Sequence, residues 1–189
     1  MLVKSVLFVL CFVSVSFSKP FVTTNYNYYN IYPTNSHKLE ENLDKSSPLS
    51  FLGSIRHGTI NWKLKYFYKK EKRGNNCSVG EVITKVDVLY TVPKIADKKA
   101  SKKVRKAFSR YYTILKEHLN KQKAYAVKAA EEIEEKLMKQ PPISRNCDIV
   151  KSDVKKIANK IIKKYKKKNK NYEIKTYEGF FDSINVEKL

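Results

Sequence analysis

The sequence predicts an α+β fold, in which an N-terminal antiparallel sheet is followed by a long helix and a second, C-terminal helix. Residues 60–68 and 82–92 alternate apolar and polar side chains, which is the period of a strand with one buried face. Residues 104–137 and 150–165 instead place apolar side chains at steps of three and four, the period of an amphipathic helix. Because the strands precede the helices rather than alternate with them, an antiparallel sheet is favoured.

The first 18 residues have the pattern of a secretory signal peptide. Lys4 precedes an apolar run over residues 6–15, and Ser16 and Ser18 supply the small residues of a cleavage site. The alternative, a membrane anchor, is disfavoured because the run is too short to cross a bilayer. We therefore expect an exported protein, periplasmic or extracellular, whose mature chain is a single domain over residues 19–189 without a transmembrane span.

Export determines how the cysteines are interpreted. Cys11 lies within the signal peptide, which leaves Cys77 and Cys147 as a pair in an oxidising compartment. We predict one disulfide between them, closing a long loop and worth about 4 kcal/mol in the chain-entropy model. Two cysteines without a nearby pair of histidines do not form a zinc ribbon.

Three shorter elements are expected around the sheet. Residues 21–32 are rich in Tyr and Asn and end at Pro33, which favours an edge strand; an unstructured mature N-terminus is the alternative. Ser36 can cap a short helix that runs through Leu43. The charged, Gly- and Asn-containing segment 69–76 predicts a turn between the two main strands.

The chain is strongly basic, with a formal net charge of +21. Such a surface attracts anionic partners such as phospholipid, acidic polymers or nucleic acid, although a solvated helix face is the alternative interpretation. Aromatic residues do not interleave regularly with the lysines, so no base-stacking platform is indicated and nucleic acid is the weaker candidate. The densest basic group lies on the second long helix: Lys151, Lys155, Lys156, Lys160, Lys163, Lys164, Lys166, Lys167, Lys168 and Lys170.

The apolar face of the first long helix carries two polar residues at its middle. His118 and Gln122 are one turn apart, and a buried polar pair requires hydrogen-bond partners. Metal-dependent hydrolases place two histidines at this spacing, with a glutamate beside the first that activates the bound water. Here the glutamate position is Leu119 and the second histidine position is Gln122. The residues alone therefore favour a core histidine over a metal ligand.

Other candidates for catalytic chemistry are few. No Gly-rich run is present to cradle a phosphate, and a Cys–His nucleophile is disfavoured because both mature cysteines are assigned to a disulfide. His37 is expected to be exposed in a loop, and His57 to support the turn before a strand. The glutamates at positions 131, 132, 134 and 135 are expected to form a solvated helix face.

A series of short motifs spans nearly the whole mature chain. After a Tyr-rich start they are His57-Gly58-Thr59-Ile60-Asn61-Trp62, Cys77 at the opening of a strand that ends at Pro93, Ala129-Ala130 on the long helix, Cys147, and Thr176-Tyr177-Glu178-Gly179. In this order and spacing they resemble the bacterial family of predicted secreted zinc-dependent proteases, known as domain of unknown function 922.

The resemblance implies a helix that carries His-Glu-x-x-His just before the Ala-rich segment. In this register the two histidines fall on His118 and Gln122, and the glutamate falls on Leu119. A late family histidine, which would be a candidate third ligand, falls on Glu178. By resemblance zinc is therefore the expected metal, with His118 as the remaining ligand, and the paired cysteines are a family feature.

Three substitutions thus coincide at the positions that zinc hydrolysis would need. Leu119 cannot exchange a proton with water, and Gln122 is a poor zinc ligand compared with imidazole. We expect a family member with a degenerate centre: not a peptidase, requiring no cofactor, and serving as a binding or structural envelope domain for peptide or anionic envelope components. The alternatives are a hydrolase in which His118, Glu178 and a further ligand hold zinc, and a polybasic binder of anionic lipid or nucleic acid.

Overall fold

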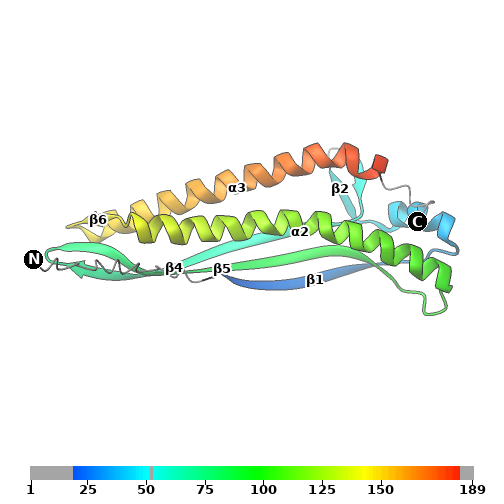
Figure 1. Cartoon of the computed structure of the whole chain (residues 1–189), viewed down its shortest axis with the longest axis horizontal. Coiled ribbons are helices and arrows are strands. Elements are labelled where there is room, and N and C mark those ends of the chain that lie inside the picture. Colours follow the sequence, from blue (N-terminus) through cyan, green and yellow to red (C-terminus); the bar gives the residue numbers. More distant parts are fainter. Residues whose placement is uncertain (1–18, 52, 184–189) are drawn as a thin grey trace, which may run out of the picture.

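Two long helices lie side by side over one face of a long sheet in the computed structural model (Figure 1). Helices α2 (Lys102–Lys139) and α3 (Cys147–Ser183) run in opposite directions and are joined at one end of the molecule, near the short strand β6 (Ile143–Ser144). The structure describes residues 19–51 and 53–183, with side chains through residue 176. The expected signal peptide, residues 1–18, lies outside the described residues.

The main sheet has the strand order β1-β5-β4, with β6 paired to the beginning of β5. Strands β4 (Thr59–Arg73) and β5 (Asn76–Ile95) form an antiparallel hairpin. The hairpin turns at Gly74, whose φ of 61° lies in the left-handed region that favours glycine. Both strands therefore continue through most of the segment that the sequence assigned to a turn.

The α+β class predicted from sequence is confirmed, but one strand pairing differs from the expectation. Strand β1 (Phe21–Ile31) is an edge strand, as predicted, and it runs parallel to β5 rather than antiparallel. Strand β4 begins at the end of the sheet where β1 ends and runs back along β5, so the hairpin leaves β5 running in the same direction as β1. Strand periodicity reports which face is buried and contains no information on strand direction.

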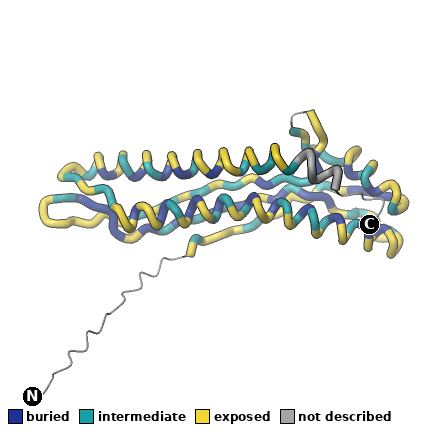
Figure 2. The backbone as a smooth tube through the Cα atoms, turned by 45° about the horizontal axis from the view of Figure 1, so that its top comes forward, coloured by how far each residue is buried: buried dark blue, intermediate teal, exposed yellow. Residues whose placement is uncertain are grey.

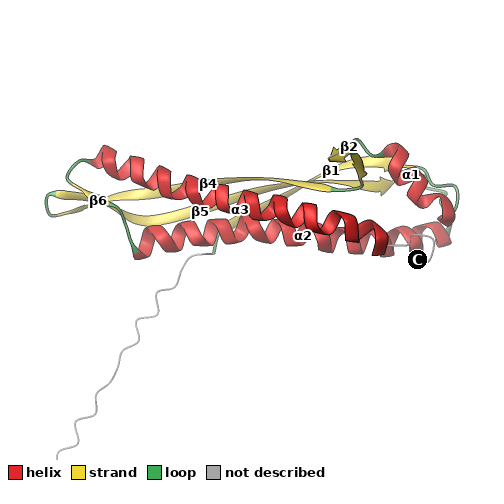
Figure 3. Ribbon diagram, turned by 90° about the horizontal axis from the view of Figure 1, so that it is seen from above, coloured by secondary structure: helices red, strands yellow, loops and turns green. Residues whose placement is uncertain are grey.

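The connection between β1 and β4 contains three small elements. A 3-10 turn (η1, Ser36–Lys38) leads into α1 (Leu39–Ser46), and a short hairpin follows, formed by β2 (Leu49–Phe51) and β3 (Ser54–Arg56). The N-cap is Asn35, one residue before the predicted Ser36, because the Asn35 side chain accepts a hydrogen bond from the backbone N–H of Lys38. Helix α1 and the β2–β3 hairpin lie near the end of the molecule where α2 begins (Figure 3).

The core runs along the interface between the sheet and the helices, and exposed residues line the outer sides of both helices (Figure 2). One cluster of buried side chains joins α2 to β1, β4 and β5, and includes Tyr90, Tyr111 and Leu119. The second joins α2 and α3 to the other half of the sheet, and includes Val82 and Ile133.

The predicted disulfide is confirmed. Cys77 at the start of β5 and Cys147 at the start of α3 are bonded, with their Cα atoms 5.3 Å apart and a sequence separation of 70. It ties the end of the sheet to the beginning of the second helix.

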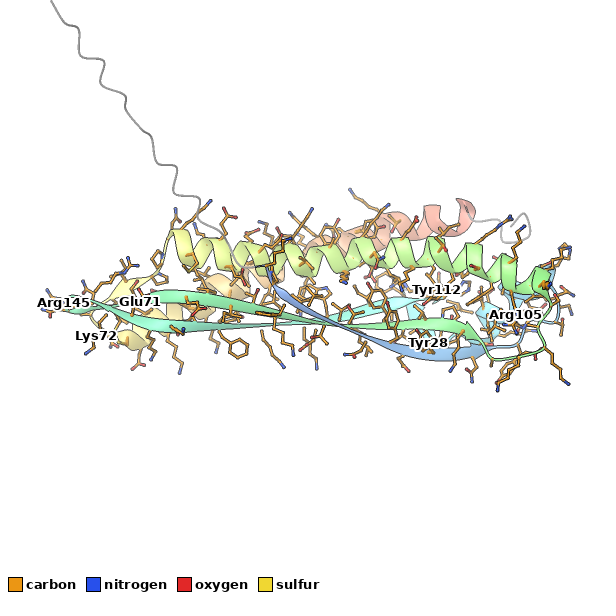
Figure 4. All side chains as sticks on the ribbon, turned by 60° about the horizontal axis from the view of Figure 1, so that its bottom comes forward. Tyr28, Glu71, Lys72, Arg105, Tyr112 and Arg145 are labelled. Atoms are coloured by element: carbon orange, nitrogen blue, oxygen red, sulfur yellow. A yellow bond between two sulfur atoms is a disulfide. The ribbon has the colours of Figure 1, made fainter. Side chains whose placement is uncertain are left out.

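The molecule is elongated, because α2 alone has 38 residues and is about 57 Å long. Glu71, Lys72 and Arg145 lie at one end of it and Arg105 lies at the other (Figure 4). Within the part of the chain that the structure describes, no helix has a stretch long and apolar enough to cross a membrane.

Candidate functional site

His118 lies between α2 and α3, and both of its ring nitrogens face other side chains. Its Nδ1 is 3.2 Å from the Tyr172 hydroxyl, and its Nε2 is 3.2 Å from the amide nitrogen of Gln122, one helical turn further along α2. The amide donates to Nε2, so the imidazole proton lies on Nδ1 and is donated to the Tyr172 oxygen. The rings of His118 and Tyr172 are stacked, with centroids 5.1 Å apart.

The surroundings of His118 favour its neutral form. Burial, together with the positive charges of Arg56 and Lys121, lowers the pKa of His118 to about 4. The ring therefore stays uncharged across the physiological pH range.

Leu119 and Gln122 are both part of the packed interior. Leu119 is 1% exposed and Gln122 is 2% exposed. Leu119 and Leu115 pack so closely on the backbone of Gly58 that a methyl group there would lie 3.1 and 3.0 Å from their respective side-chain carbons. The position that would carry a catalytic base is thus filled by hydrocarbon in the core. The Oε1 atom of Gln122 is buried and has no hydrogen-bond partner among the described residues.

The segment just before β4 crosses this region and is held to three helices. The Arg56 guanidinium lies 2.8 Å from the Glu173 carboxylate on α3 and 3.8 Å from the centroid of the Phe51 ring. The next residue, His57, is buried and contacts Asp44 of α1 at 2.7 Å and the Tyr111 hydroxyl of α2 at 2.5 Å. Burial lowers the pKa of His57, and the Asp44 carboxylate opposes this shift. His57 therefore ties helices together at a bend before a strand, in agreement with a structural role.

A cavity of about 540 Å³ lies beside the Arg56–Glu173 ion pair, between α3 and the segment formed by β2, β3 and the start of β4. Its lining combines cations, aromatic rings and neutral polar groups. The lining includes Arg56, Trp62, Lys166, Asn169, Lys170 and Glu173.

The predicted basic patch forms an exposed surface along α3. All ten of its lysines are exposed. Lys164 contacts Glu132 of α2 at 2.7 Å, and Lys156 contacts Asp153 at 3.4 Å. Lys166 and Lys170 belong to this patch and also line the cavity.

Among the residues whose side chains the structure describes, the groups beside His118 are not the set that zinc prefers. The neighbours of the imidazole nitrogens are an amide and a phenol, and Leu119 offers no donor atom. In residues 19–51 and 53–176, no group of three His, Cys, Asp or Glu side chains is placed to hold a metal. Glu178 belongs to α3 by its backbone, and its side chain lies outside the described residues. His37 is exposed, as predicted.

Residues 26–179 match the family model described as a bacterial protein of unknown function, DUF922. The chain belongs to this family. The resemblance inferred from the short motifs is thereby confirmed, and the matched range includes His118, Leu119, Gln122 and both cysteines of the disulfide. No curated protein and no solved structure matches the chain.

Sequence reasoning was wrong about one glutamate of this DUF922 chain. Glu134 was assigned to a solvated helix face, and the structure shows it 3% exposed. Its Oε1 accepts hydrogen bonds from the backbone N–H of Thr84, at 2.9 Å, and from the Thr84 hydroxyl, at 2.6 Å. Thr84 lies on the buried face of β5, so the carboxylate of Glu134 satisfies polar groups of the sheet interior.

The sequence also gave no indication that Glu173 would pair with Arg56 or that Tyr172 would contact His118. Helix α3 continues well beyond the last periodic apolar residue, and this extension places Tyr172 and Glu173 opposite the middle of α2. The nearest signal in the sequence is the acidic residue directly after a tyrosine in an otherwise lysine-rich stretch.

Proposed function

We propose that this DUF922 protein is an exported, non-catalytic binding domain on the scaffold of a metalloprotease-like family. The main support is the environment of His118: Gln122 and Tyr172 occupy both sides of its ring, and the neighbouring base position is a packed leucine. A hydrolase would need a ligand and a base at these two places.

Export is supported by the sequence pattern at residues 1–18 and is compatible with the Cys77–Cys147 disulfide. A binding role is supported by the cavity beside the Arg56–Glu173 ion pair, since clefts of several hundred Å³ are typical of ligand sites. The expected ligands are peptide or anionic envelope material.

The proposal is tested by the zinc content of the protein purified after export, without an affinity tag and at neutral pH. The expected result is a metal content well below one equivalent, unchanged by His118→Ala. His37→Ala is the matched control, because His37 is an exposed histidine away from the centre. One tightly held equivalent of zinc that is lost in His118→Ala and retained in His37→Ala would overturn the proposal and favour a hydrolase that uses His118 and Glu178.

A second candidate function is supported by the exposure of all ten lysines of the basic patch. In this alternative the patch binds an anionic lipid surface without a specific site. Binding to phosphatidylglycerol vesicles would then fall steeply between low and moderate salt, because counterion release and screening govern such contacts. Binding that does not change with salt would exclude this alternative.

A further inference from the structure

We infer that the cavity between α3 and the segment formed by β2, β3 and the start of β4 binds an acidic saccharide, a sugar that carries a carboxylate or a phosphate. The inference rests on the proposed binding function and specifies the ligand class of that site. It is drawn from the charge, the rings and the unsatisfied polar group that line the cavity.

The charge of the cavity favours an anion. The guanidinium of Arg56 is balanced by Glu173, 2.8 Å away. Lys166 and Lys170 are one helical turn apart on α3 and both line the cavity. Neither ammonium has an ion-pair partner among the side chains that the structure describes. The cavity therefore has two uncompensated positive charges on the same side.

The cavity lining also favours a ligand that donates hydrogen bonds. Asn169 lines the cavity, and its Oδ1 atom is buried and has no hydrogen-bond partner among the described residues. A buried acceptor needs a donor, and neither a carboxylate nor a dianionic phosphate has one. Sugar hydroxyl groups donate and accept, and the Asn61 amide is available beside them.

An aromatic ring completes the match to a sugar. The indole of Trp62 lines the cavity, with the Lys166 ammonium 5.8 Å from its ring centroid. An aromatic face next to polar groups suits a ring that is apolar on one face and hydroxylated at its edge. The volume of about 540 Å³ lies within the range of small-molecule sites.

Trp62 makes the inference directly testable, because it is the one tryptophan in the sequence. Trigalacturonate and glucose 6-phosphate are titrated into the purified protein, with calorimetry for affinity and tryptophan fluorescence for location. The first probe tests a carboxylated sugar and the second a phosphorylated one. Neutral galactotriose and triglutamate are the comparison ligands, one lacking the charge and the other lacking the sugar.

We expect at least one acidic sugar to bind and to change the fluorescence of Trp62, with galactotriose and triglutamate at least about tenfold weaker. The double variant Lys166→Gln/Lys170→Gln should lose about tenfold or more in affinity, since it removes both uncompensated charges. The matched control, Lys151→Gln/Lys155→Gln, removes the same charge at the same spacing from exposed positions on the same helix. It should bind within about twofold of the unaltered protein.

Three results would overturn the inference. The first is no binding of either acidic sugar. The second is binding that leaves Trp62 fluorescence unchanged or is weakened equally by both lysine pairs, which would place the ligand on the general basic surface. The third is triglutamate binding as tightly as the sugars, which would assign the cavity to acidic peptides. In each case, a protein that holds no zinc would still support the proposed non-catalytic function. Failure of the ligand assignment is therefore distinguishable from failure of the proposed function.

Discussion

Leu119→Ala tests whether Leu119 is a packed core residue or the remnant of a catalytic position. Leu119 is 1% exposed, and with Leu115 it packs on the backbone of Gly58. Truncating a fully buried leucine costs about 2.7–5 kcal/mol, depending on how far the surroundings collapse into the cavity. Because Leu119 lies in the middle of a long helix held by a sheet and a second helix, collapse is restricted, and we expect a loss in the upper part of this range, about 4 kcal/mol.

Urea unfolding at pH 7, followed by far-ultraviolet circular dichroism with the disulfide intact, measures this loss. The midpoint should fall while the m-value stays constant, since the folded and unfolded surfaces change little. The matched control is Leu89→Ala, at a position 41% exposed on β5, which should cost less than about 1 kcal/mol. A Leu119→Ala loss as small as that of the control would refute the packed-core account of the base position.

Three further predictions follow from the described contacts. Glu134→Ala should destabilise the fold by about 1–3 kcal/mol in urea unfolding, because the Thr84 N–H loses its buried acceptor; a loss below that of Leu89→Ala would contradict this. The pKa of His118 is about 4 in the folded protein, below its ordinary value of 6.5. The free energy of unfolding should therefore fall as the pH is lowered from 6.5 towards 4, because the unfolded chain then binds a proton that the folded protein does not. After discounting for solvent screening this decline is about 2 kcal/mol, and His118→Gln should abolish that part of the pH dependence; an identical pH profile would contradict it. Replacing the disulfide by Cys77→Ser/Cys147→Ser should cost about 4 kcal/mol of unfolding free energy, and an unchanged thermal midpoint would exclude that contribution.

The elements that the sequence predicted well are those with a strong period. The alternation at residues 82–92 placed Val86, Val88 and Tyr90 on one face of a strand, and all three are buried. The parallel pairing of β1 could not be predicted in this way, because it depends on whether β1 lies beside β5 or beside β4, and alternation does not distinguish the two. The disulfide was predictable because Cys11 falls in the expected signal peptide, which leaves two further cysteines and one pairing.

The sequence indicated His118 and Gln122 as candidate residues, but it did not indicate the side chains of α3 that lie near them. His118 was expected on the inward face of α2; it is half-buried there, and its neighbour Leu119 is buried more fully. Gln122 was expected to need a partner and has one in His118. Tyr172 and Glu173 escaped prediction because apolar periodicity ends before them, although α3 continues.

The central claim is that His118 is a structural histidine, and nitrogen NMR of its side chain tests this claim most directly. The protein, labelled with ¹⁵N at its histidines, is titrated with one equivalent of Zn²⁺ at pH 7, and His118→Gln assigns the signals. The account predicts a neutral ring protonated on Nδ1 whose two nitrogen shifts do not change when zinc is added. A zinc-dependent shift of a His118 ring nitrogen at one equivalent, with the His57 signals unaffected, would contradict the account and assign His118 to a metal site.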